Sequence, residues 1–508
     1  MSLRRRAPRL ALLPTAVALA LVGGLAAPVQ AAEPTSVIAN DTVWRDTAGQ
    51  PILAQGGNVL KVGSTYYLVG QKLVSGQPKA INLYSSTDLE NWTFAGPILE
   101  QSGTEGPLAV GKWLGRPQLN HNPTTGKFVL VVEVNDQMVD VGEEKPWGRN
   151  GILFATSDTI DGTYTPTTTQ SLKANGRTTG DHSVFVDGPN AYLVYVADRG
   201  GRDINSMINV APLNESWTGI EPSVYSEDYP HKEAPAALKT NGKYYLFASG
   251  MRSWDATATY YRVGDTLGGW DKSQPWNKVA HRPSRGTADN SFGTQFEQVF
   301  PVVGVNGTTS YLYNGDRYSQ YRNGTVPAPG GVGRNAWYPM TFEDTAPVLH
   351  GWTDVDVDVQ AGTLTGNRVA NARFDQDFEG ARIPHWTVKA GSTARTEGPA
   401  PTPEDQNPPR WLEVKSGWVS QDVDLPNGSY ELSFDHRSSG AQQNAYVEVK
   451  NHNGTASRKV HLTAKQDSWA TKKIPFAVAD GKATLGAWTN GPANSWLEID
   501  NVRLWPAG

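Results

Sequence analysis

The chain has 508 residues and a net charge of −5 at pH 7, with 45 Lys and Arg against 50 Asp and Glu, and it contains no cysteine. The lack of cysteine excludes disulfides, cysteine nucleophiles and thiolate metal sites. A charge balance this close to neutral, without a basic stripe, argues against a nucleic-acid partner. The 17 Trp and 19 Tyr suit sugar binding, although most of these rings are expected in the core.

The first 31 residues have the features of a secretory leader. A basic stretch (residues 2–9) precedes an apolar run (residues 10–27), and residues 29–31 (VQA) supply a small-residue cleavage site. We therefore expect residues 1–31 to be a signal peptide and the mature protein to be secreted and extracellular. No later segment is long and apolar enough to span a bilayer, so no membrane partner is expected.

A turn followed by a short aromatic and aliphatic run occurs five times. The copies are residues 63–68 (GSTYYL), 126–130 (GKFVL), 188–195 (GPNAYLVY), 241–246 (NGKYYL) and 307–313 (GTTSYLY). Each has the turn chemistry and composition of the second half of a β-hairpin. The interval of roughly 50–65 residues is typical of an array whose units bury their cores against neighbours.

A second element, a strand with an Asp-led turn and an aromatic residue, recurs between these hairpins, for example at residues 83–92 (LYSSTDLENW). The alternative fold is a β-sandwich with regular hairpins, but a sandwich would not repeat the same two-part unit five times. We therefore predict an all-β fold, with a five-bladed β-propeller over residues 32–362.

The blade repeat stops near residue 366, and alternating strands without it continue to the end of the chain. Residues 368–508 are the size of one antiparallel β-sandwich. Their opening residues 371–380 (NARFDQDFEG) with Trp386, and their closing residues 497–504 (LEIDNVRL), resemble jelly-roll carbohydrate-binding modules. The candidate sugar-stacking residues are Trp411, Trp418, Trp469 and Trp488. A purely structural or docking domain is the alternative.

Polar residues begin the blades at intervals that follow the repeat. They are Gln55, Arg116, Asp181, Glu233 and Gln295. The inner strands of a propeller converge at one end of its central funnel, so these five side chains are expected to face one another there. The sequence thus predicts one active site, at the mouth of the funnel.

Several motifs at these places together resemble glycoside hydrolase family 43, and within it the exo-β-1,3-galactanase branch. They include residues 54–70, 116–119 (RPQL), 180–187, 233–236 (EAPA), 242–250 with Trp254, 292–295 (FGTQ) and 315–317 (GDR). The resemblance covers nearly all of residues 40–355, and EAP and FGTQ in their blade positions are its more discriminating parts.

Glycosidic cleavage needs a carboxylic acid that is protonated near neutral pH. Position and resemblance both indicate Glu233 as this general acid. The resemblance implies that Asp181 modulates the pKa of the acid and orients it, and a turn-capping Asp is the structural alternative. The candidates for substrate binding are Gln55, Gln71, Arg116, Trp254, Asp316 and Arg317. The alternative for Asp316 and Arg317 is that they form an ion pair in the funnel wall.

The catalytic base is less clear, because the family's usual first-blade Asp is replaced by Gln55. The galactanase branch is thought to use a Gln on the last blade, matched here by Gln295, which as an amide would position water or act through its imidic tautomer. That branch also has acidic residues where this chain has Gly115 and Gln71. Glu133, a lone charge in an apolar strand, is a candidate replacement base or sugar ligand, and an outward-facing surface Glu is the alternative.

The function expected from these residues is that of a secreted exo-acting glycosidase of galactan or arabinogalactan that inverts configuration. The alternatives are an arabinofuranosidase or xylosidase of the same family and a catalytically silent propeller that binds glycan. The expected partner is a polysaccharide or oligosaccharide, and the protein is expected to be a monomer. No cofactor is predicted, and no cluster with metal-ligand spacing supports a structural Ca²⁺.

Overall fold

The computed structural model describes residues 37–507 except 75–76, 136–148, 171–178, 198–206, 253, 319–332, 377–382, 401, 403–407 and 455. Within this part of the chain, every regular element is a β-strand except one short 3₁₀ helix, Gly286–Ala288. The predicted all-β class is therefore confirmed. No helix in the described ranges could cross a membrane. The predicted signal peptide lies outside the described residues.

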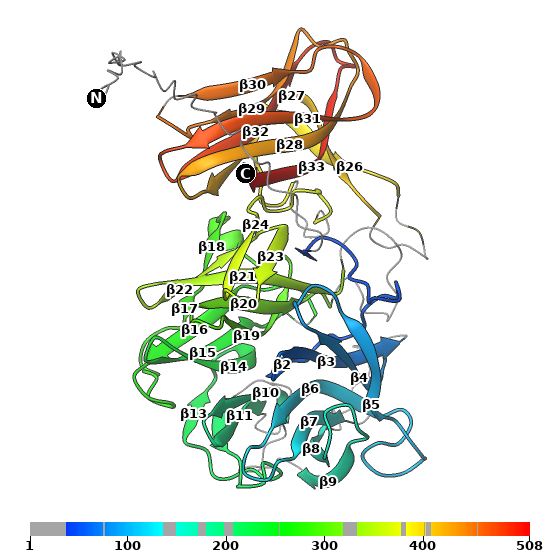
Figure 1. Ribbon diagram of the computed structural model, residues 1–508, viewed down its shortest axis with the longest axis vertical. Coiled ribbons are helices and arrows are strands. Elements are labelled where there is room, and N and C mark those ends of the chain that lie inside the picture. The colour runs from blue at the N-terminus through cyan, green and yellow to red at the C-terminus, as the bar shows by residue number, and fades with distance from the viewer. Residues whose placement is uncertain are drawn as a thin grey trace, which may run out of the picture.

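Five four-stranded antiparallel units follow one another along the chain (blue to green in Figure 1). The first three are β2 (Val59–Val62), β3 (Thr65–Val74), β4 (Gln77–Ser86) and β5 (Thr93–Glu100); β6 (Trp113–His121), β7 (Phe128–Asn135), β8 (Arg149–Ser157) and β9 (Thr165–Gln170); and β10 (Thr179–Asp187), β11 (Asn190–Ala197), β12 (Met207–Pro212) and β13 (Tyr225–Asp228). The next two are β14 (Lys232–Thr240), β15 (Lys243–Gly250), β16 (Thr259–Gly264) and β17 (Asn277–Lys278), and β19 (Gln295–Val303), β20 (Thr309–Asp316), β21 (Asn335–Glu343) and β22 (Ala346–His350). β18 (Ala280–Arg282) adds a parallel strand to β22.

All five predicted hairpins form, and each joins the first two strands of its sheet. The turn between β14 and β15 shows why the sequence signal was strong. Asn241 and Gly242 both have positive φ, 50° and 71°, which is the conformation that a two-residue type I′ turn requires.

A sixth sheet completes the propeller. It contains β1 (Ile38–Ala39), β23 (Asp354–Asp358) and β24 (Thr363–Asn367). The prediction of five blades was therefore wrong, because the propeller has six sheets. In the sixth sheet β24 pairs with β23 and ends at Asn367. The hairpin repeat missed this sheet because β1 is a two-residue strand from the other end of the chain.

The ring closes around Trp337 of β21, whose indole is fully buried in an apolar cluster that the first, fifth and sixth sheets share. Trp44, Trp92 and Phe300 surround this ring at centroid distances of 5.1, 5.8 and 5.1 Å. Separate apolar clusters fill the other junctions between neighbouring sheets. Each sheet therefore depends on both neighbours to bury its faces.

The C-terminal domain is a β-sandwich (orange and red in Figure 1). Its strands are β25 (Thr387–Val388), β26 (Thr393–Glu397), β27 (Trp411–Asp424), β28 (Gly428–Ser438), β29 (Asn444–Lys450), β30 (Ser457–His461), β31 (Gln466–Val478), β32 (Lys482–Asn490) and β33 (Leu497–Pro506).

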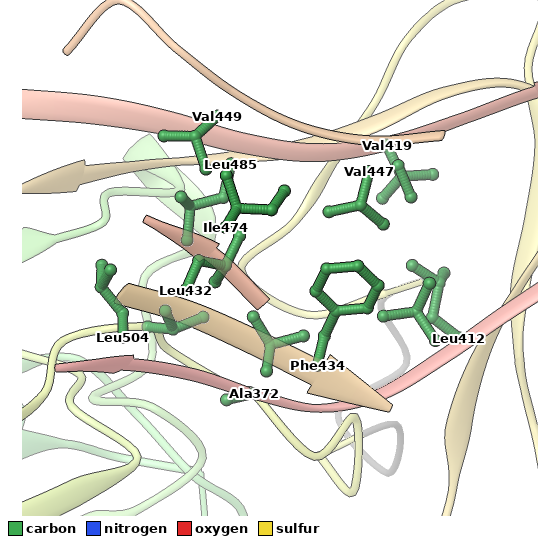
Figure 2. Packing of buried hydrophobic residues seen from close by; sticks show 14 of the residues in the cluster. Ala372, Leu412, Val419, Leu432, Phe434, Val447, Val449, Ile474, Leu485 and Leu504 are labelled. Atoms are coloured by element: carbon green, nitrogen blue, oxygen red, sulfur yellow. The ribbon is translucent and has the colours of Figure 1, made fainter. Parts of the chain in front are cut away.

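The long strand β27 belongs to both layers of this sandwich. Its first part pairs with β26 and β33, and from Gly417 onward it pairs with β32. Gly417 has a φ of 88° and its α-carbon faces Ser392 closely, so a side chain there would be strained and would collide. The two layers enclose one apolar core, in which Val447 and Leu485 face Leu432 and Phe434 (Figure 2).

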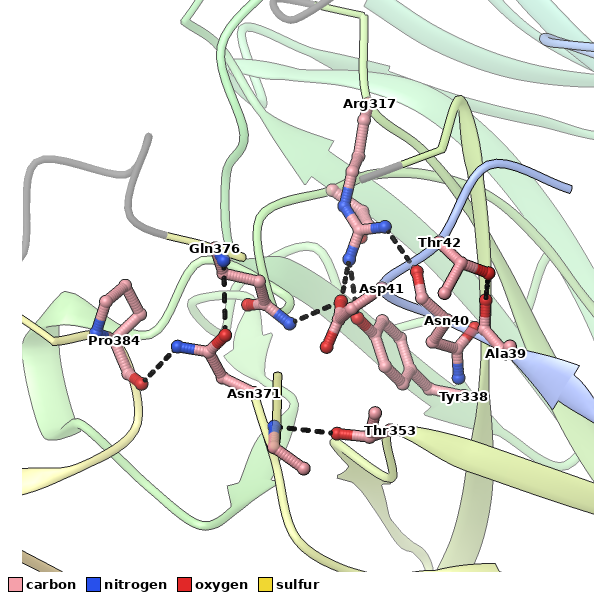
Figure 3. Close-up of polar contacts among 12 residues, drawn as sticks. Ala39, Asn40, Asp41, Thr42, Arg317, Tyr338, Thr353, Asn371, Gln376 and Pro384 are labelled. Carbon is pink, nitrogen blue, oxygen red and sulfur yellow. Dashed lines mark hydrogen bonds and ion pairs between the residues drawn. The ribbon is translucent and has the colours of Figure 1, made fainter. Parts of the chain in front are cut away.

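A buried ion pair of the propeller lies at the junction of the two domains. The Arg317 guanidinium donates to Asp41 Oδ1 at 2.9 Å, and both side chains are completely buried. Arg317 also donates to the Asn40 carbonyl at 2.7 Å, while Gln376 of the sandwich donates to the same Asp41 oxygen at 2.8 Å (Figure 3). Burial raises the pKa of Asp41, and the charge of Arg317 opposes that shift. Asp41 thus binds the fifth sheet and the sandwich at once.

We expect Asp41→Ala to lower the free energy of unfolding by about 3–5 kcal/mol, because it leaves the Arg317 charge buried without its partner. Urea unfolding followed by tryptophan fluorescence measures the loss. The matched control is Asp265→Ala, which removes the exposed partner of Lys243 and should change stability by less than about 1 kcal/mol. Equal losses in the two variants would contradict the interpretation.

Candidate active site

Irregularities in the first strands of the sheets place the candidate residues. The antiparallel register shifts between Gly115 and Gln118 in β6, between Thr179 and His182 in β10, between Glu233 and Ala236 in β14, and between Phe296 and Gln298 in β19. A β-bulge bends its strand and redirects a side chain. The first strands of neighbouring sheets also contact one another. Four sheets therefore present a redirected residue at the same end of the funnel.

A buried ion pair crosses the funnel from the second sheet to the fifth. The Arg116 guanidinium faces both carboxylate oxygens of Glu297, with Nη1–Oε1 at 3.0 Å and Nη2–Oε2 at 2.7 Å. Arg116 Nε lies 3.8 Å from Asp181 Oδ1. Burial alone would lower the pKa of Arg116, but the carboxylates of Glu297, Asp181 and Glu133 raise it above its ordinary value. The charge of Arg116 is therefore permanent.

Asp316 forms a second buried carboxyl group beside Glu297. Its Oδ2 accepts the Gly56 amide at 2.8 Å and its Oδ1 accepts Asn335 Nδ2 at 2.6 Å. Burial raises the pKa of Asp316 to about 7. Burial also raises the pKa of Glu297, against the attraction of Arg116, and the two carboxyl groups are hydrogen-bonded to each other. Such a bond between carboxyl groups requires a proton, so the pair holds one near neutral pH.

Asp181 and Glu233 are connected through the backbone. Asp181 Oδ2 accepts the amide of Ala234, the residue after Glu233, at 3.0 Å. Ala234 has a φ of 50°, in the left-handed region that non-glycine residues rarely adopt. Glu233 is half-buried, and the bulge after it fixes its direction. The predicted acid and its predicted modulator are thus brought to one place by a strained turn.

The two first-sheet amides lie side by side, because Gln55 and Gln71 form an isolated β-bridge. Gln55 is buried, and its Oε1 accepts Arg334 Nη1 at 2.6 Å. Gln71 Oε1 lies over Gly56, where a β-carbon would be 2.2 Å from it and 2.8 Å from the Tyr318 hydroxyl. Glycine at position 56 therefore gives Gln71 and Tyr318 access to the same space.

The fifth sheet contributes Gln295, which is buried at the start of β19 and stands opposite Asp316 in the β19–β20 register. Gln295 Nε2 donates to the Asp255 carbonyl at 2.9 Å, which sets the orientation of the amide. Trp254, the residue before Asp255, is half-buried and contacts the rings of Trp113 and Tyr318 at centroid distances of 6.1 and 5.3 Å. Trp254 thus borders the same cluster.

Glu133 is buried in β7 and stands opposite Gly115 in the register of the second sheet. The alternative that Glu133 is an outward-facing surface residue is therefore wrong. Its carboxylate is near enough to Arg116 to raise the pKa of that guanidinium together with Glu297 and Asp181. Glu133 therefore belongs to the funnel cluster.

The prediction for Arg317 is wrong. This guanidinium is completely buried at the domain junction, where it contacts Asp41, the Asn40 carbonyl and the Tyr338 hydroxyl. Asp316 and Arg317 are consecutive, so their side chains point to opposite sides of the strand end. Asp316 faces inward, and Arg317 faces the sandwich.

Sequence patterns assigned no role to Tyr318 or Arg334. Tyr318 donates to Glu297 Oε1 at 3.2 Å. The signal for Tyr318 was available, because it stands two residues after Asp316 and alternate strand residues share a side. Arg334 reaches Gln55 from a position before β21 that no motif marks.

The four candidate tryptophans of the sandwich fall into two groups. The Arg437 guanidinium lies over Trp411 and Trp469, 5.1 and 4.5 Å from the ring centroids, and the two rings contact each other edge to face at 6.1 Å. Trp418, Trp488 and Tyr446 instead stand opposite one another across three neighbouring strands. Tyr446 and Trp488 are stacked at 5.4 Å, and all three rings are half-buried. These three residues form an aromatic row on the outer side of one layer.

The shared proton of Asp316 and Glu297 predicts a pH dependence of stability. A carboxyl group whose pKa is raised in the folded state stabilises most below its unfolded pKa of about 4, and this contribution disappears as the pH rises through about 7. Asp316→Asn should therefore lose less stability than the unmodified protein between pH 4 and pH 8, as measured by urea unfolding. The exposed Asp158→Asn is the control and should keep the original slope. Identical slopes for all three proteins would contradict the shared proton.

Comparison with known proteins adds a family to this geometry. The crystal structure of an exo-β-1,3-galactanase from Phanerochaete chrysosporium with β-1,3-galactotriose is 21% identical, and the match covers 92% of this chain and 100% of that chain with a TM-score of 0.58. An exo-β-1,3-galactanase from Clostridium thermocellum is 20% identical over 92% of this chain and 99% of that one, with a TM-score of 0.56. Both likenesses concern the fold. No curated protein matches the chain.

The model of glycosyl hydrolases family 43 matches residues 49–323, which include Gln55, Arg116, Asp181, Glu233 and Gln295. This match spans more than half of the chain. The chain therefore belongs to glycosyl hydrolases family 43 and is a glycoside hydrolase.

Proposed function

We propose that this glycoside hydrolase removes galactose from the ends of β-1,3-linked galactan chains, with inversion at the anomeric carbon. The observation that carries the proposal is the contact between Asp181 and the amide after Glu233, which holds two carboxyl groups together in the funnel. The proposed substrate rests on the fold shared with two exo-β-1,3-galactanases, a likeness that extends over the propeller and the sandwich.

Glu233 is the proposed general acid, which gives its proton to the glycosidic oxygen as the bond breaks. A second negative charge near an acid favours the protonated form of that acid, and Asp181 is the proposed source of this charge. Arg116 lies on the other side of Asp181, 3.8 Å from it, and is itself held by Glu297. In this arrangement Arg116 and Glu297 are positioning residues for Asp181.

Water attack needs a group on the opposite side of the sugar from the acid. In this chain Gln55 and Gln295 stand at the starts of the first and fifth sheets, where neither amide can accept a full proton at neutral pH. The bond from Gln295 Nε2 to the Asp255 carbonyl fixes the amide at the start of β19, and an amide oxygen is a hydrogen-bond acceptor for water. We propose that Gln295 positions the attacking water.

The test is the release of reducing sugar from β-1,3-galactan, arabinogalactan, arabinan and xylan. We expect turnover of β-1,3-galactan, and a loss of roughly 10²- to 10⁴-fold in turnover rate for Glu233→Gln because the proton donor is removed. The control Glu221→Gln changes an exposed glutamate on the third sheet and should keep full activity. Turnover of arabinan or xylan alone would replace the proposed substrate by a pentose polymer. Galactan binding without any turnover would indicate a silent propeller.

We further propose that the protein is secreted, on the strength of residues 1–31, and that its sandwich holds the enzyme on polysaccharide through the aromatic row. The row places three aromatic rings on one side of a layer, and the ammonium groups of Lys450 and Lys459 lie over Trp418 and Tyr446 at 4.5 and 4.4 Å from the ring centroids. The Trp418 indole covers Gly486, where a β-carbon would be 2.3 Å from the ring. Flat aromatic surfaces with polar edges are suited to stacking on sugar rings.

We expect Trp488→Ala to weaken retention on insoluble β-1,3-galactan about tenfold or more, because it removes the central ring of the row. Retention is measured by depletion from solution, using full-length protein that also carries Glu233→Gln. The matched control is Trp469→Ala, which removes a ring packed against Arg437 on the other layer. Unchanged retention of the Trp488 variant would leave the sandwich with a structural role only.

A further inference from the structure

Gly115 and Glu133 meet in the second sheet at the mouth of the funnel. They are paired in the antiparallel register of β6 and β7, immediately before the bulge that carries Arg116. A β-carbon added to Gly115 would lie 3.0 Å from Glu133 Oε2. The Glu133 carboxylate therefore occupies the space into which a side chain at position 115 would project.

The requirement for glycine at position 115 comes from this space and not from the backbone. Gly115 is absent from the residues with positive φ, so the backbone there accepts any L-residue. The obstacles are the Trp113 indole, whose Nε1 would lie 2.1 Å from the added β-carbon, and the Glu133 carboxylate. A larger residue at position 115 would therefore displace Trp113 and Glu133 from their present places.

The surroundings of Glu133 suit a group that holds substrate. Arg116 follows Gly115 and keeps its positive charge close to the Glu133 carboxylate. Trp113 continues through ring contacts to Trp254 and Tyr318, which border the cluster of Glu297 and Asp316. An ionised carboxylate beside aromatic rings can accept two hydroxyl hydrogens from one sugar ring while the rings cover its apolar face.

We infer that Glu133 is a specificity-determining residue that accepts hydrogen bonds from the hydroxyl groups of the terminal sugar, and that Gly115 is required to give its carboxylate this place. The inference rests on the proposed function, because it takes the substrate to be a galactose-ended chain. It assigns Glu133 to binding and leaves the activation of water to another group.

The experiment is a double-mutant cycle with Gly115→Ala, Glu133→Gln and the double variant, assayed on β-1,3-galactobiose. Hydrogen bonds to a charged group correspond to roughly 10- to 100-fold in affinity, so each single variant should raise KM by that factor and change kcat by less than about threefold. If the two residues act as one unit, the double variant will be no worse than the more affected single variant. Glu133→Asp should recover part of the loss, since it restores the charge.

Gly250→Ala is the matched glycine control. Gly250 ends β15 in the fourth sheet, and its nearest contact to an added β-carbon is an ordinary 3.4 Å. It should keep the original KM. Thermal unfolding of every variant checks that the fold is retained.

If Glu133→Gln instead slows turnover by roughly two orders of magnitude or more while KM stays unchanged, Glu133 is the base and the inference is overturned. Additive effects in the cycle would overturn the pairing with Gly115, and unchanged kinetics would reduce Glu133 to a structural role.

These outcomes differ from failure of the proposed function. If the unmodified protein cleaves arabinan or xylan instead, the cycle is run on that substrate, and if it only binds galactobiose, the cycle is run on Kd. Absence of both turnover and binding rejects both proposals.

Discussion

The ion pair between Arg116 and Glu297 is the interaction on which the site depends. Both groups are buried, and removal of two charges from water is unfavourable unless their geometry is close to ideal. The two short contacts meet that condition. The pair joins the second sheet to the fifth. Arg116 also lies next to Asp181, and Glu297 shares a proton with Asp316, so the four side chains form one charged network.

The network explains why the functional residues stand on bulges. A regular strand in a propeller sends its side chains toward the neighbouring sheets, where they fill apolar clusters. A carboxylate at such a position would lose its hydration without gaining a partner. One extra residue in the strand turns the side chain toward the funnel instead, where other charged groups meet it. The left-handed conformations of Arg116 and Ala234 are part of this arrangement.

The domain junction is a second network that lies directly behind the first. Asp316 ends β20 in the funnel, and the next residue, Arg317, binds Asp41 and the sandwich side of the molecule. The backbone amide of Arg317 also donates to the carbonyl of Arg334, whose side chain holds Gln55. The sandwich is therefore in structural contact with the wall of the site, through residues that are neighbours in the chain.

Local chemistry made much of the fold predictable. The five hairpins were found because Gly and Asn at the turns and alternating apolar residues after them are short-range signals. The sixth sheet was not found, because Ile38 and Ala39 pair with Val355 and Asp354 from the far end of the propeller. A pairing at such separation leaves no periodic trace in the sequence.

Local sequence is enough to predict which sheets carry the candidate residues, since the hairpin repeat gives the start of each blade. It also determined the residue types available there, Asp181 and Glu233 among them. Which of these side chains meet depends on the folded arrangement of the sheets. Asp316 faces the funnel and Arg317 the sandwich, and Glu133 fills the space above Gly115. The physical reason is that these contacts depend on bulges and on packing between distant strands, whereas the turns depend only on the backbone preferences of neighbouring residues.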